Sequence, residues 1–209
     1  MAEQHDHHHH DEHESLVVED DAGNIEGQIL IDALQQVLID KGLLSAAEVS
    51  RAIVKLESPG IHLGANIVVK AWQDEAFKQS LLEDGKGSIE SIGIAVGEAQ
   101  IVVVENTETT HNLITCTLCS CYPRSILGQP PSWYISKAYR ARTVREPRTV
   151  LAEFGLDLAK DIQLTVHDSN ADMRYLVLPT PPDDFENMST DQLLASVTRD
   201  HLIGVARQV

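Results

Sequence analysis

Positive charge is scarce in this sequence of 209 residues, which has 16 lysines and arginines against 32 aspartates and glutamates. The formal net charge of −16 argues against nucleic acids and anionic membranes as partners, because both repel an acidic surface. The sequence also lacks an apolar run of 18 residues and a secretory signal pattern. We therefore expect a soluble, cytoplasmic protein that binds neither nucleic acid nor a membrane.

Cysteine is equally scarce: the chain has three, all between Cys116 and Cys121, in the spacing C-x-x-C-x-C. Three cysteines this close together do not form a disulfide framework. Thiolates are soft ligands for transition metals, so the cluster predicts a metal site. Structural zinc prefers four protein ligands, but the sequence has no fourth cysteine and no H-x3-5-H motif. Zinc would need His111 or a ligand from a partner; three purely structural cysteines are the other alternative.

The contiguous residues Cys119, Ser120 and Cys121 allow a different coordination. Their two sulfurs flank the peptide nitrogens of Ser120 and Cys121, so two deprotonated amides and two thiolates can lie in one plane. Cys116 can cap that plane and leave a sixth position open, which suits an octahedral metal ion acting as a Lewis acid on water or substrate. We call residues 115–123, with the sequence TCTLCSCYP, the claw loop.

The rest of the chain divides by pattern into three parts. Residues 1–24 form an acidic tail that holds six of the ten histidines, and we expect it to be disordered. Because imidazoles bind cobalt, nickel and zinc, metal scavenging is an alternative to a purification tag. Residues 25–95 are predicted to form a helical arm, with apolar stripes, a capping box from Ser45 to Glu48 and a helix start at Asp74.

Residues 96–209 are predicted to form an α+β metal-binding catalytic domain. Apolar and alternating segments indicate strands near residues 101–105, 112–115, 162–166 and 175–178. Helices are expected over residues 146–154, ended by Gly155, and over residues 193–197. The fold class is therefore α+β: an N-terminal helical arm followed by a mixed α/β layered domain that carries the claw loop.

The claw loop resembles that of the metal-binding, α-type subunit of nitrile hydratases and of the related gamma subunit of thiocyanate hydrolase. The resemblance extends from about Ile31 to Ala206. It includes the segments Val103–Thr107, Pro131–Tyr134, Tyr139–Arg142, Val144–Arg148 and Val197–Asp200. Thr117, where the iron class has serine, is similar to the cobalt class. The resemblance thus implies Co(III), with iron as the less favoured metal.

The resemblance also implies a role for each residue of the claw. Cys116, Cys119 and Cys121 would supply thiolates, and Ser120 and Cys121 their amide nitrogens. Cys119 would be oxidised to a cysteine sulfinic acid and Cys121 to a cysteine sulfenic acid. These anionic groups need cations, which the family draws from arginines of its β-type subunit. A metallochaperone or activator protein would be a further partner.

Catalysis is expected at Cys121, Ser120 and Arg124. The sulfenate of Cys121 would act as nucleophile or base while the metal polarises the C≡N carbon. Arg124 departs from nitrile hydratases, which carry tryptophan there, and matches thiocyanate hydrolase, as does Gln129. A cation beside the metal would suit anionic thiocyanate. Nitrile hydratases also have a glutamine in G-x-Q-G-E where this chain has the residues GEAQ at 97–100.

Three functions fit these observations, in decreasing order of preference. The first is the metal subunit of a cobalt nitrile hydratase, which converts a small nitrile to an amide. The second is the gamma-type subunit of thiocyanate hydrolase, which converts thiocyanate to carbonyl sulfide and ammonia. The third is a non-catalytic metal-binding or metallochaperone-like subunit, which only the histidine-rich tail supports.

Some polar residues outside the ligand set are expected to be structural. His111 and His167 should be satisfied by hydrogen bonds, and Thr117 should shape the claw loop. Asp168 and Arg174 should pair on the surface rather than support the site. Tyr122 is a candidate for lining the pocket.

Overall fold

The computed structural model describes residues 25–207, and the histidine-rich tail predicted for residues 1–24 lies outside this range. Its N-terminal helices are α1 (Ile25–Asp40), α2 (Ala46–Glu57), α3 (Ile61–Gln73), α4 (Glu75–Glu83) and α5 (Gly85–Ser91). The strands are β1 (Gln100–Glu105), β2 (Thr110–Thr115), β3 (Gln163–Asp168) and β4 (Met173–Leu178). The later helices are α6 (Arg124–Leu127), α7 (Ser132–Ile135), α8 (Lys137–Arg145), α9 (Pro147–Glu153), η1 (Phe185–Asn187), α10 (Thr190–Ser196) and α11 (Arg199–Ile203).

The four strands form two parallel pairs. β1 pairs with β4 from Gln100 opposite Met173 to Glu105 opposite Leu178. β2 pairs with β3 in the same sense, and the carboxyl end of this pair brings Thr115 opposite Asp168. Parallel neighbours need long crossover connections, and the segment that links β2 to β3 contains the claw loop and helices α6–α9. The claw loop therefore begins where β2 ends.

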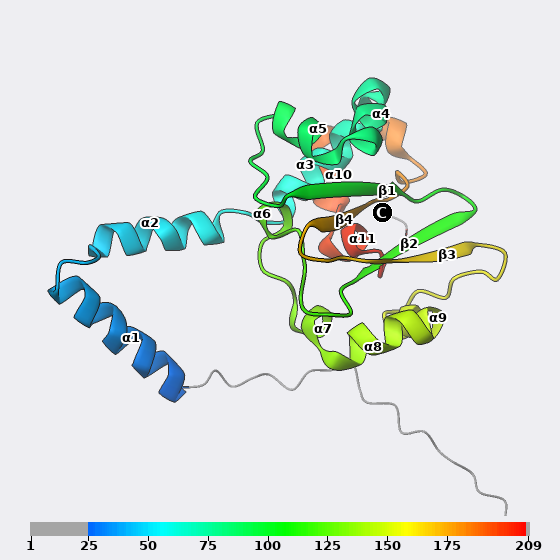
Figure 1. Cartoon of the computed structure of the whole chain (residues 1–209). Helices are drawn as coiled ribbons and strands as arrows, with labels where there is room; N and C mark the ends of the chain where they lie inside the picture. Colours follow the sequence, from blue (N-terminus) through cyan, green and yellow to red (C-terminus); the bar gives the residue numbers. More distant parts are fainter. Residues whose placement is uncertain (1–24, 208–209) are drawn as a thin grey trace, which may run out of the picture.

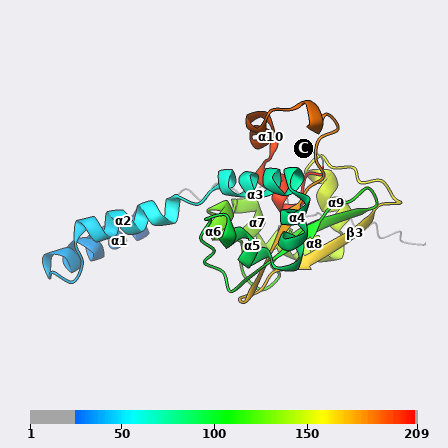
Figure 2. The ribbon, with the colours of Figure 1, turned by 90° about the horizontal axis from the view of Figure 1, so that it is seen from above.

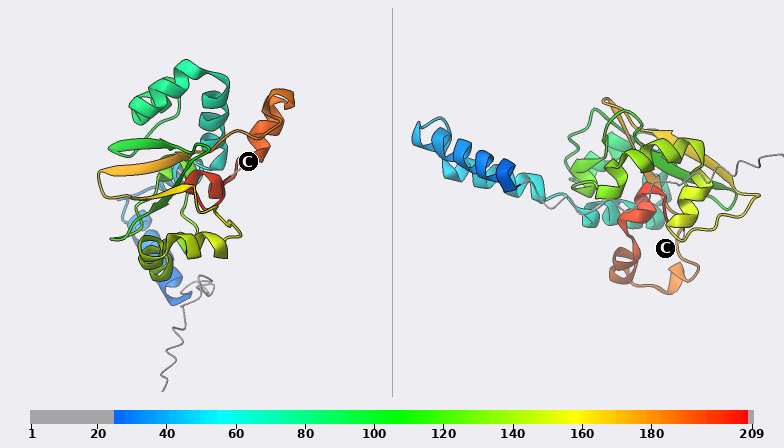
Figure 3. Two further views of the ribbon diagram at one scale, coloured as in Figure 1. Left: turned by 90° about the vertical axis from the view of Figure 1, so that its right-hand side faces the viewer. Right: turned by 90° about the horizontal axis from the view of Figure 1, so that it is seen from below.

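Helices cover the strands from two sides. In Figure 1 the helices α3, α4 and α5 lie above the strands and α7, α8 and α9 lie below them; the left view of Figure 3 shows the same layering. The buried core joins these layers through side chains from α3, the strands and α11, among them Ile67, Leu113, Val177 and Leu202. This arrangement is the layered α+β fold predicted from the sequence.

Helix α3 packs unusually close to its neighbours because it carries a glycine at the contact. A Cβ added to Gly64 would lie 2.6 Å from Leu202 and 2.7 Å from Leu127. The absence of a side chain therefore lets α3 approach α11 and α6 at the same point. Since α6 follows the claw loop directly, Gly64 helps to set where the claw loop leaves the core.

The predicted helical arm separates into two parts. Helices α1 and α2 project away from the rest of the described chain, α3 to α11, which we call the body (Figures 1 and 2). Helix α2 buries none of its residues. Helix α3, in contrast, buries six residues and packs against α4, and α5 packs against α4 and β1. The capping box predicted at Ser45 is present, and Asp74 accepts a hydrogen bond from Phe77 N at the start of α4.

Most predicted elements are confirmed, but several short helices were missed. The missed elements are α5, α6, α7, α8, α11 and the 3-10 turn η1. Each has nine residues or fewer, so none holds enough helical turns to give a clear apolar period. Among the described helices, none has the length and apolar content required to span a bilayer.

Candidate metal centre

The three cysteines lie together at the carboxyl end of β2. Their sulfurs are within 4.8 Å of one another, and they are the one group of this kind found among the described residues. Cys116 and Cys121 are buried, whereas Cys119 is exposed beside Leu118 at the tip of the claw loop. Ser120 is half-buried between the two cysteines. The sequence spacing therefore produces one compact sulfur cluster that is open on one side.

The spacing of the sulfurs distinguishes between coordination geometries. The Sγ atoms of Cys116 and Cys119 are 3.4 Å apart, and those of Cys119 and Cys121 are 3.1 Å apart. With metal–sulfur bonds of about 2.3 Å, two sulfurs would be about 3.3 Å apart at an octahedral angle and about 3.8 Å apart at a tetrahedral angle. These two sulfur pairs thus fit an octahedral ion better than tetrahedral zinc.

Ionisation of the thiols also differs along the loop. Hydrogen bonds from Cys121 and then Cys116 lower the pKa of Cys119 to about 7. Burial raises the pKa of Cys121 to about 12, its hydrogen bond to Cys119 adds to the rise, and the charge of Arg174 opposes part of it. Because a thiolate is the form that binds metal, Cys119 is the sulfur ready to bind near neutral pH.

The first turn of the claw loop is fixed by Asp168 at the end of β3. Its carboxylate accepts hydrogen bonds from Thr117 N at 2.8 Å and from Thr117 Oγ1 at 2.6 Å. The predicted surface pair of Asp168 and Arg174 is therefore wrong, and Arg174 donates instead to the backbone carbonyl of Asn170. The parallel pairing of β2 and β3 explains the difference, because it places Asp168 opposite Thr115, next to the loop. Thr117 shapes the loop, as expected.

An aromatic cluster supports the loop near its end, at Cys121, and the strand that leads into it, at Ile114. The Tyr134 hydroxyl donates to the carbonyl of Cys121 at 2.8 Å, and the Tyr139 hydroxyl donates to the carbonyl of Ile114 at 2.7 Å. Tyr122 packs edge-on against Tyr134, with ring centroids 5.1 Å apart. Burial raises the pKa values of both tyrosine donors, so they stay protonated and keep donating. Tyr122 is buried in this cluster, so it does not line an open pocket.

The two candidate histidines are structural. His111 is buried, with Nε2 2.7 Å from the carbonyl of Gly204 and Nδ1 3.3 Å from Asn106 Nδ2. His167 Nε2 lies 2.8 Å from Asn112 Oδ1. Burial lowers the pKa values of both imidazoles, which are therefore neutral at pH 7. Zinc binding through His111 is wrong, because both nitrogens of that ring face protein partners.

Arg124 lies on the far side of the claw loop, where α6 begins. It is exposed and, with Ser125, lines a mostly apolar groove of 970 Å³ between α2, α3 and the loop before β1, and this groove contains none of the cysteines. Sequence reasoning missed Glu98, which binds Ser125 through both carboxylate oxygens. The sequence signal that could have pointed to Glu98 was the segment at residues 97–100, which departs from the expected pattern G-x-Q-G-E. Gln100, by contrast, is exposed at the start of β1 and lines a different groove.

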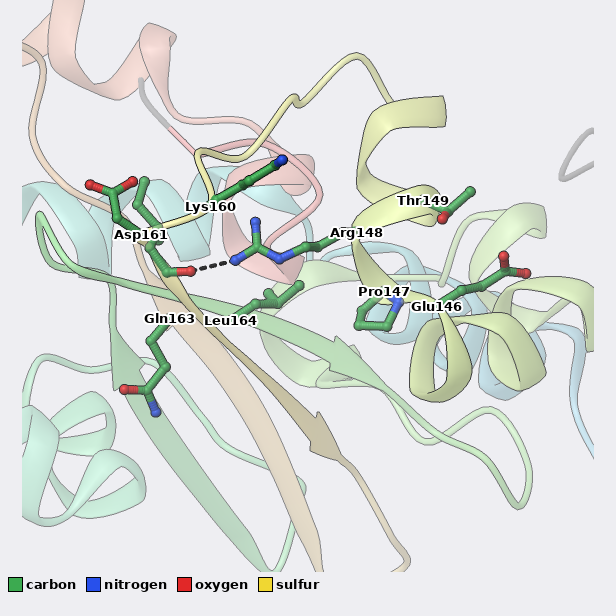
Figure 4. A pocket seen from close by; sticks show the side chains of 9 residues that line it. Glu146, Pro147, Arg148, Thr149, Lys160, Asp161, Gln163 and Leu164 are labelled. Atoms are coloured by element: carbon green, nitrogen blue, oxygen red, sulfur yellow. Dashed lines mark hydrogen bonds between the residues drawn. The ribbon is translucent and has the colours of Figure 1, made fainter.

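A second groove, of 550 Å³, lies at the opposite end of the β2–β3 pair (Figure 4). It is lined by residues 146–149 and 160–164 and contains none of the cysteines. Gln163 at its edge pairs with Thr110, about 17 Å along β2 from Thr115. Arg148 spans this groove and donates to the carbonyls of Leu158, Ala159 and Ile162. Its guanidinium therefore holds a loop in place.

Comparison with known proteins agrees with this geometry. Residues 25–206 match the family model "Nitrile hydratase, alpha chain". The low-molecular weight cobalt-containing nitrile hydratase subunit alpha of Rhodococcus rhodochrous is 47% identical over 178 residues, which cover 84% of this chain and 86% of the relative. Thiocyanate hydrolase subunit gamma of Thiobacillus thioparus is 40% identical over 191 residues, 86% of this chain and 79% of the relative.

Solved structures support the same assignment. An Fe-type nitrile hydratase double mutant from Comamonas testosteroni Ni1 superposes with a TM-score of 0.82 at 41% identity, covering 90% of this chain and 93% of that chain. The match thus includes both the fold and the segment that carries the cysteines. The chain belongs to the nitrile hydratase alpha-chain family.

Proposed function

We propose that this chain is the metal-carrying catalytic subunit of a cobalt nitrile hydratase, which adds water to the C≡N bond of a small nitrile and releases an amide. The observation that carries the proposal is the cluster of three cysteine sulfurs, in which Cys119 lies 3.4 Å from Cys116 and 3.1 Å from Cys121. The similarity to a cobalt-containing alpha subunit supports it. As an alpha chain, the protein works with a partner subunit of the β type.

The claw loop offers a complete set of protein ligands. The sulfurs of Cys116, Cys119 and Cys121 and the amide nitrogens of Ser120 and Cys121 would hold Co(III). A bound Co(III) would supply Lewis acidity toward the nitrile or a water molecule. Thr117 and the cobalt-containing relative favour cobalt, whereas the Fe-type structural neighbour makes iron the alternative to exclude.

Buried polar groups near the loop favour oxidised sulfurs. Thr115 Oγ1, Ser169 Oγ and Arg174 Nε are buried without a hydrogen-bond partner within the described chain. Each of these groups can donate a hydrogen bond. Sulfinate oxygens on Cys119 and a sulfenate oxygen on Cys121 would be suitable acceptors, and arginines of the β-type subunit would complete their neutralisation.

The chain's own residues then have distinct roles in the reaction. The sulfenate of Cys121 acts as nucleophile or base, and Ser120 presents its amide between the two oxidised cysteines. Tyr134 holds the carbonyl of Cys121, which fixes the direction of the Cys121 side chain. Asp168 holds the opposite end of the loop through Thr117. Catalysis in this site depends on how the claw loop is positioned, so loss of the Tyr134 or the Asp168 hydrogen bonds should reduce turnover.

Thiocyanate is the second candidate substrate, and Arg124 is the observation that favours it. The guanidinium is exposed on a groove whose other lining residues are mostly apolar. A cation there attracts a small anion but gives a neutral nitrile no comparable benefit. The 40% identity to a thiocyanate hydrolase subunit is consistent with this alternative.

One experiment separates the candidate functions. The chain is co-expressed with its β-type partner in the presence of cobalt, and the purified complex is assayed on acrylonitrile and on thiocyanate. Amide release supports the first function, and carbonyl sulfide release supports the second. A complex that holds cobalt but converts neither substrate would indicate the third, a metal-binding subunit without activity.

Two further measurements on the same complex test the metal, the oxidation of the cysteines and the role of Arg124 in substrate choice. Metal analysis with intact mass should report one cobalt per chain and three added oxygens, two on Cys119 and one on Cys121. Arg124→Trp should weaken the affinity for thiocyanate if thiocyanate is the substrate. If every activity is unchanged in this variant, Arg124 has no part in substrate choice.

A further inference from the structure

We propose that Glu98 is a positioning residue that holds Arg124 at the groove between α2, α3 and the loop before β1, and thereby sets the affinity for an anionic substrate. This inference rests on the proposed function, because it concerns the same site. Glu98 lies in the loop between α5 and β1, 26 positions before Arg124, and contacts none of the cysteines in the structure. It would act on the reaction only through the segment that leaves the claw loop.

The carboxylate of Glu98 binds both polar groups of one residue in α6. Oε1 accepts from Ser125 N at 3.1 Å, and Oε2 accepts from the Ser125 hydroxyl. Both side chains are partly buried, which shields the contact from water. A carboxylate with two donors from one residue defines the direction of the backbone more tightly than a single hydrogen bond does.

Helix α6 needs this contact because it lacks a cap of its own. It has only four residues, and Pro123, at the N-cap position, provides no side-chain hydrogen bond. The first amides of a helix require an acceptor, which a neighbouring side chain usually supplies. Glu98 supplies it from a distant part of the sequence. The negative charge is also at the favourable end of the helix.

Glu98 is itself held in place from the other side. Lys86 in α5 donates to the carbonyl of Glu98 at 2.7 Å. The next residue back, Gly97, lies next to α6, where a Cβ on it would be in ordinary van der Waals contact with Ser125 Cβ at 3.8 Å. The loop before β1 thus connects α5 to α6 as a bracket, with Glu98 as its contact point.

Arg124 depends on this bracket because its own side chain is not fixed. It immediately precedes Ser125, is exposed, and forms no ion pair within the described part of the chain. The backbone that Glu98 holds therefore sets where the Arg124 side chain begins, and with it the region that the guanidinium can reach. Val96 and Gly97 line the same groove as Arg124 and Ser125, so the bracket also forms part of the wall of that groove.

The test uses the cobalt-loaded complex with its partner subunit. Glu98→Ala should raise KM for thiocyanate, or the inhibition constant of thiocyanate where the complex converts a nitrile, at least about tenfold, the size expected for a lost hydrogen bond to a charged group. KM for a neutral nitrile, which gains nothing from the Arg124 charge, should stay within twofold. The kcat, the cobalt content and the sulfur-to-cobalt absorption band should stay within twofold of the parent. Glu98→Gln, which keeps one acceptor oxygen, should give a smaller rise in KM.

A double variant shows whether Glu98 acts through Arg124. In an Arg124→Ala background, Glu98→Ala should change KM little further, because the group it positions is gone. Glu90→Ala is the matched control, since Glu90 lies 3.9 Å from Lys86 but makes no contact with α6. An unchanged affinity for thiocyanate in Glu98→Ala, a full effect in the Arg124→Ala background, or a parallel loss of cobalt would each overturn the proposal.

A second measurement does not depend on activity and so separates failure of this proposal from failure of the proposed function. Hydrogen–deuterium exchange of the peptide containing residues 122–129 reports on the Ser125 amide. Glu98→Ala should speed exchange there about tenfold and leave the peptide containing residues 110–115 unchanged. If exchange is unaltered, Glu98 does not hold α6, whatever substrate the complex converts.

Discussion

Helices α2 and α3 follow one another in the chain and have nearly the same length, but they bury very different amounts of surface. Helix α2 has 12 residues and buries none of them, whereas α3 has 13 residues and buries six. Both carry apolar side chains on one face. In α2 these are exposed, as in Ile53 and Leu56, and in α3 the equivalent face is the centre of the core.

This difference indicates that partner binding and metal binding are carried by different parts of the molecule. The body completes its own core and holds the claw loop through Asp168 and Tyr134. The arm of α1 and α2 keeps large apolar side chains exposed, including Leu30, Leu34 and Val54. An exposed apolar surface of this kind marks an interaction site. Because alpha chains work with a β-type partner, we expect the arm to bind that partner.

The largest effect should come from removing one sulfur of the body. Cys116→Ser should abolish cobalt binding and reduce activity below detection, because an alcohol oxygen is a much harder ligand than a thiolate. The variant should still associate with the β-type subunit through its arm. Metal analysis, activity assays and size-exclusion chromatography of the co-expressed complex check the three statements. Loss of association together with the metal would show that the arm and the body are coupled.

Identical substitutions in the two helices should separate their contributions to stability. Ile67→Ala in α3 should lower the free energy of unfolding by about 2–5 kcal/mol, because Ile67 is fully buried. Ile53→Ala in α2, where the side chain is 46% exposed, should change it by less than about 0.5 kcal/mol. Urea denaturation of the isolated chain measures both. Equal losses would mean that α2 packs on the body in solution.

The contrast between these helices also shows what the sequence can predict. Both α2 and α3 show a helical apolar period, so the sequence predicts both helices, and the more apolar composition of α3 favours its burial without naming its contacts. Burial depends on contacts with distant residues, such as Leu202 against Gly64, which a local pattern does not contain. For the same reason the single helical arm predicted for residues 25–95 divides into a projecting part and a packed part.

The metal centre was more predictable than its surroundings. Three cysteines within six residues can converge on one point wherever the chain turns, so the spacing predicts the cluster at Cys116, Cys119 and Cys121, and the turn of the claw loop brings the sulfurs together. The contacts that hold it involve residues far away in the sequence. Asp168 is 51 positions from Thr117, and Glu98 is 27 positions from Ser125. Parallel strand pairing and loop packing create these neighbours, and neither is visible in the sequence pattern.

A charge placed on the arm should weaken the complex without unfolding the chain. Leu56→Asp should raise the dissociation constant for the β-type subunit about 10- to 100-fold, since a carboxylate would be buried against an apolar surface. The melting temperature of the isolated chain should be unchanged, because Leu56 is exposed. Glu57→Asp on the same turn is the control and should leave affinity unaltered. Unchanged affinity in Leu56→Asp would place the partner elsewhere.

The smallest expected effect concerns the body alone, and it is a shift in the pH midpoint of cysteine alkylation. Cys119 is exposed and its pKa is about 7, whereas Cys116 and Cys121 are buried and the pKa of Cys121 is about 12. An ordinary cysteine thiol has a pKa of about 8.5. In the metal-free chain iodoacetamide should therefore modify Cys119 first, with a half-maximal rate near pH 7, because the thiolate is the reactive form. Peptide mapping by mass spectrometry follows each site.

The direction of the shift can be tested through the hydrogen bond that causes it. Cys121 makes the largest contribution to lowering the pKa of Cys119. Cys121→Ala should move the midpoint of Cys119 alkylation upward toward the ordinary value, so that less thiolate is present at pH 7. Cys121→Ser keeps a donor at the same position and should move it less. Equal labelling of all three sites in the folded parent chain would show that the claw loop is not preformed before metal binds.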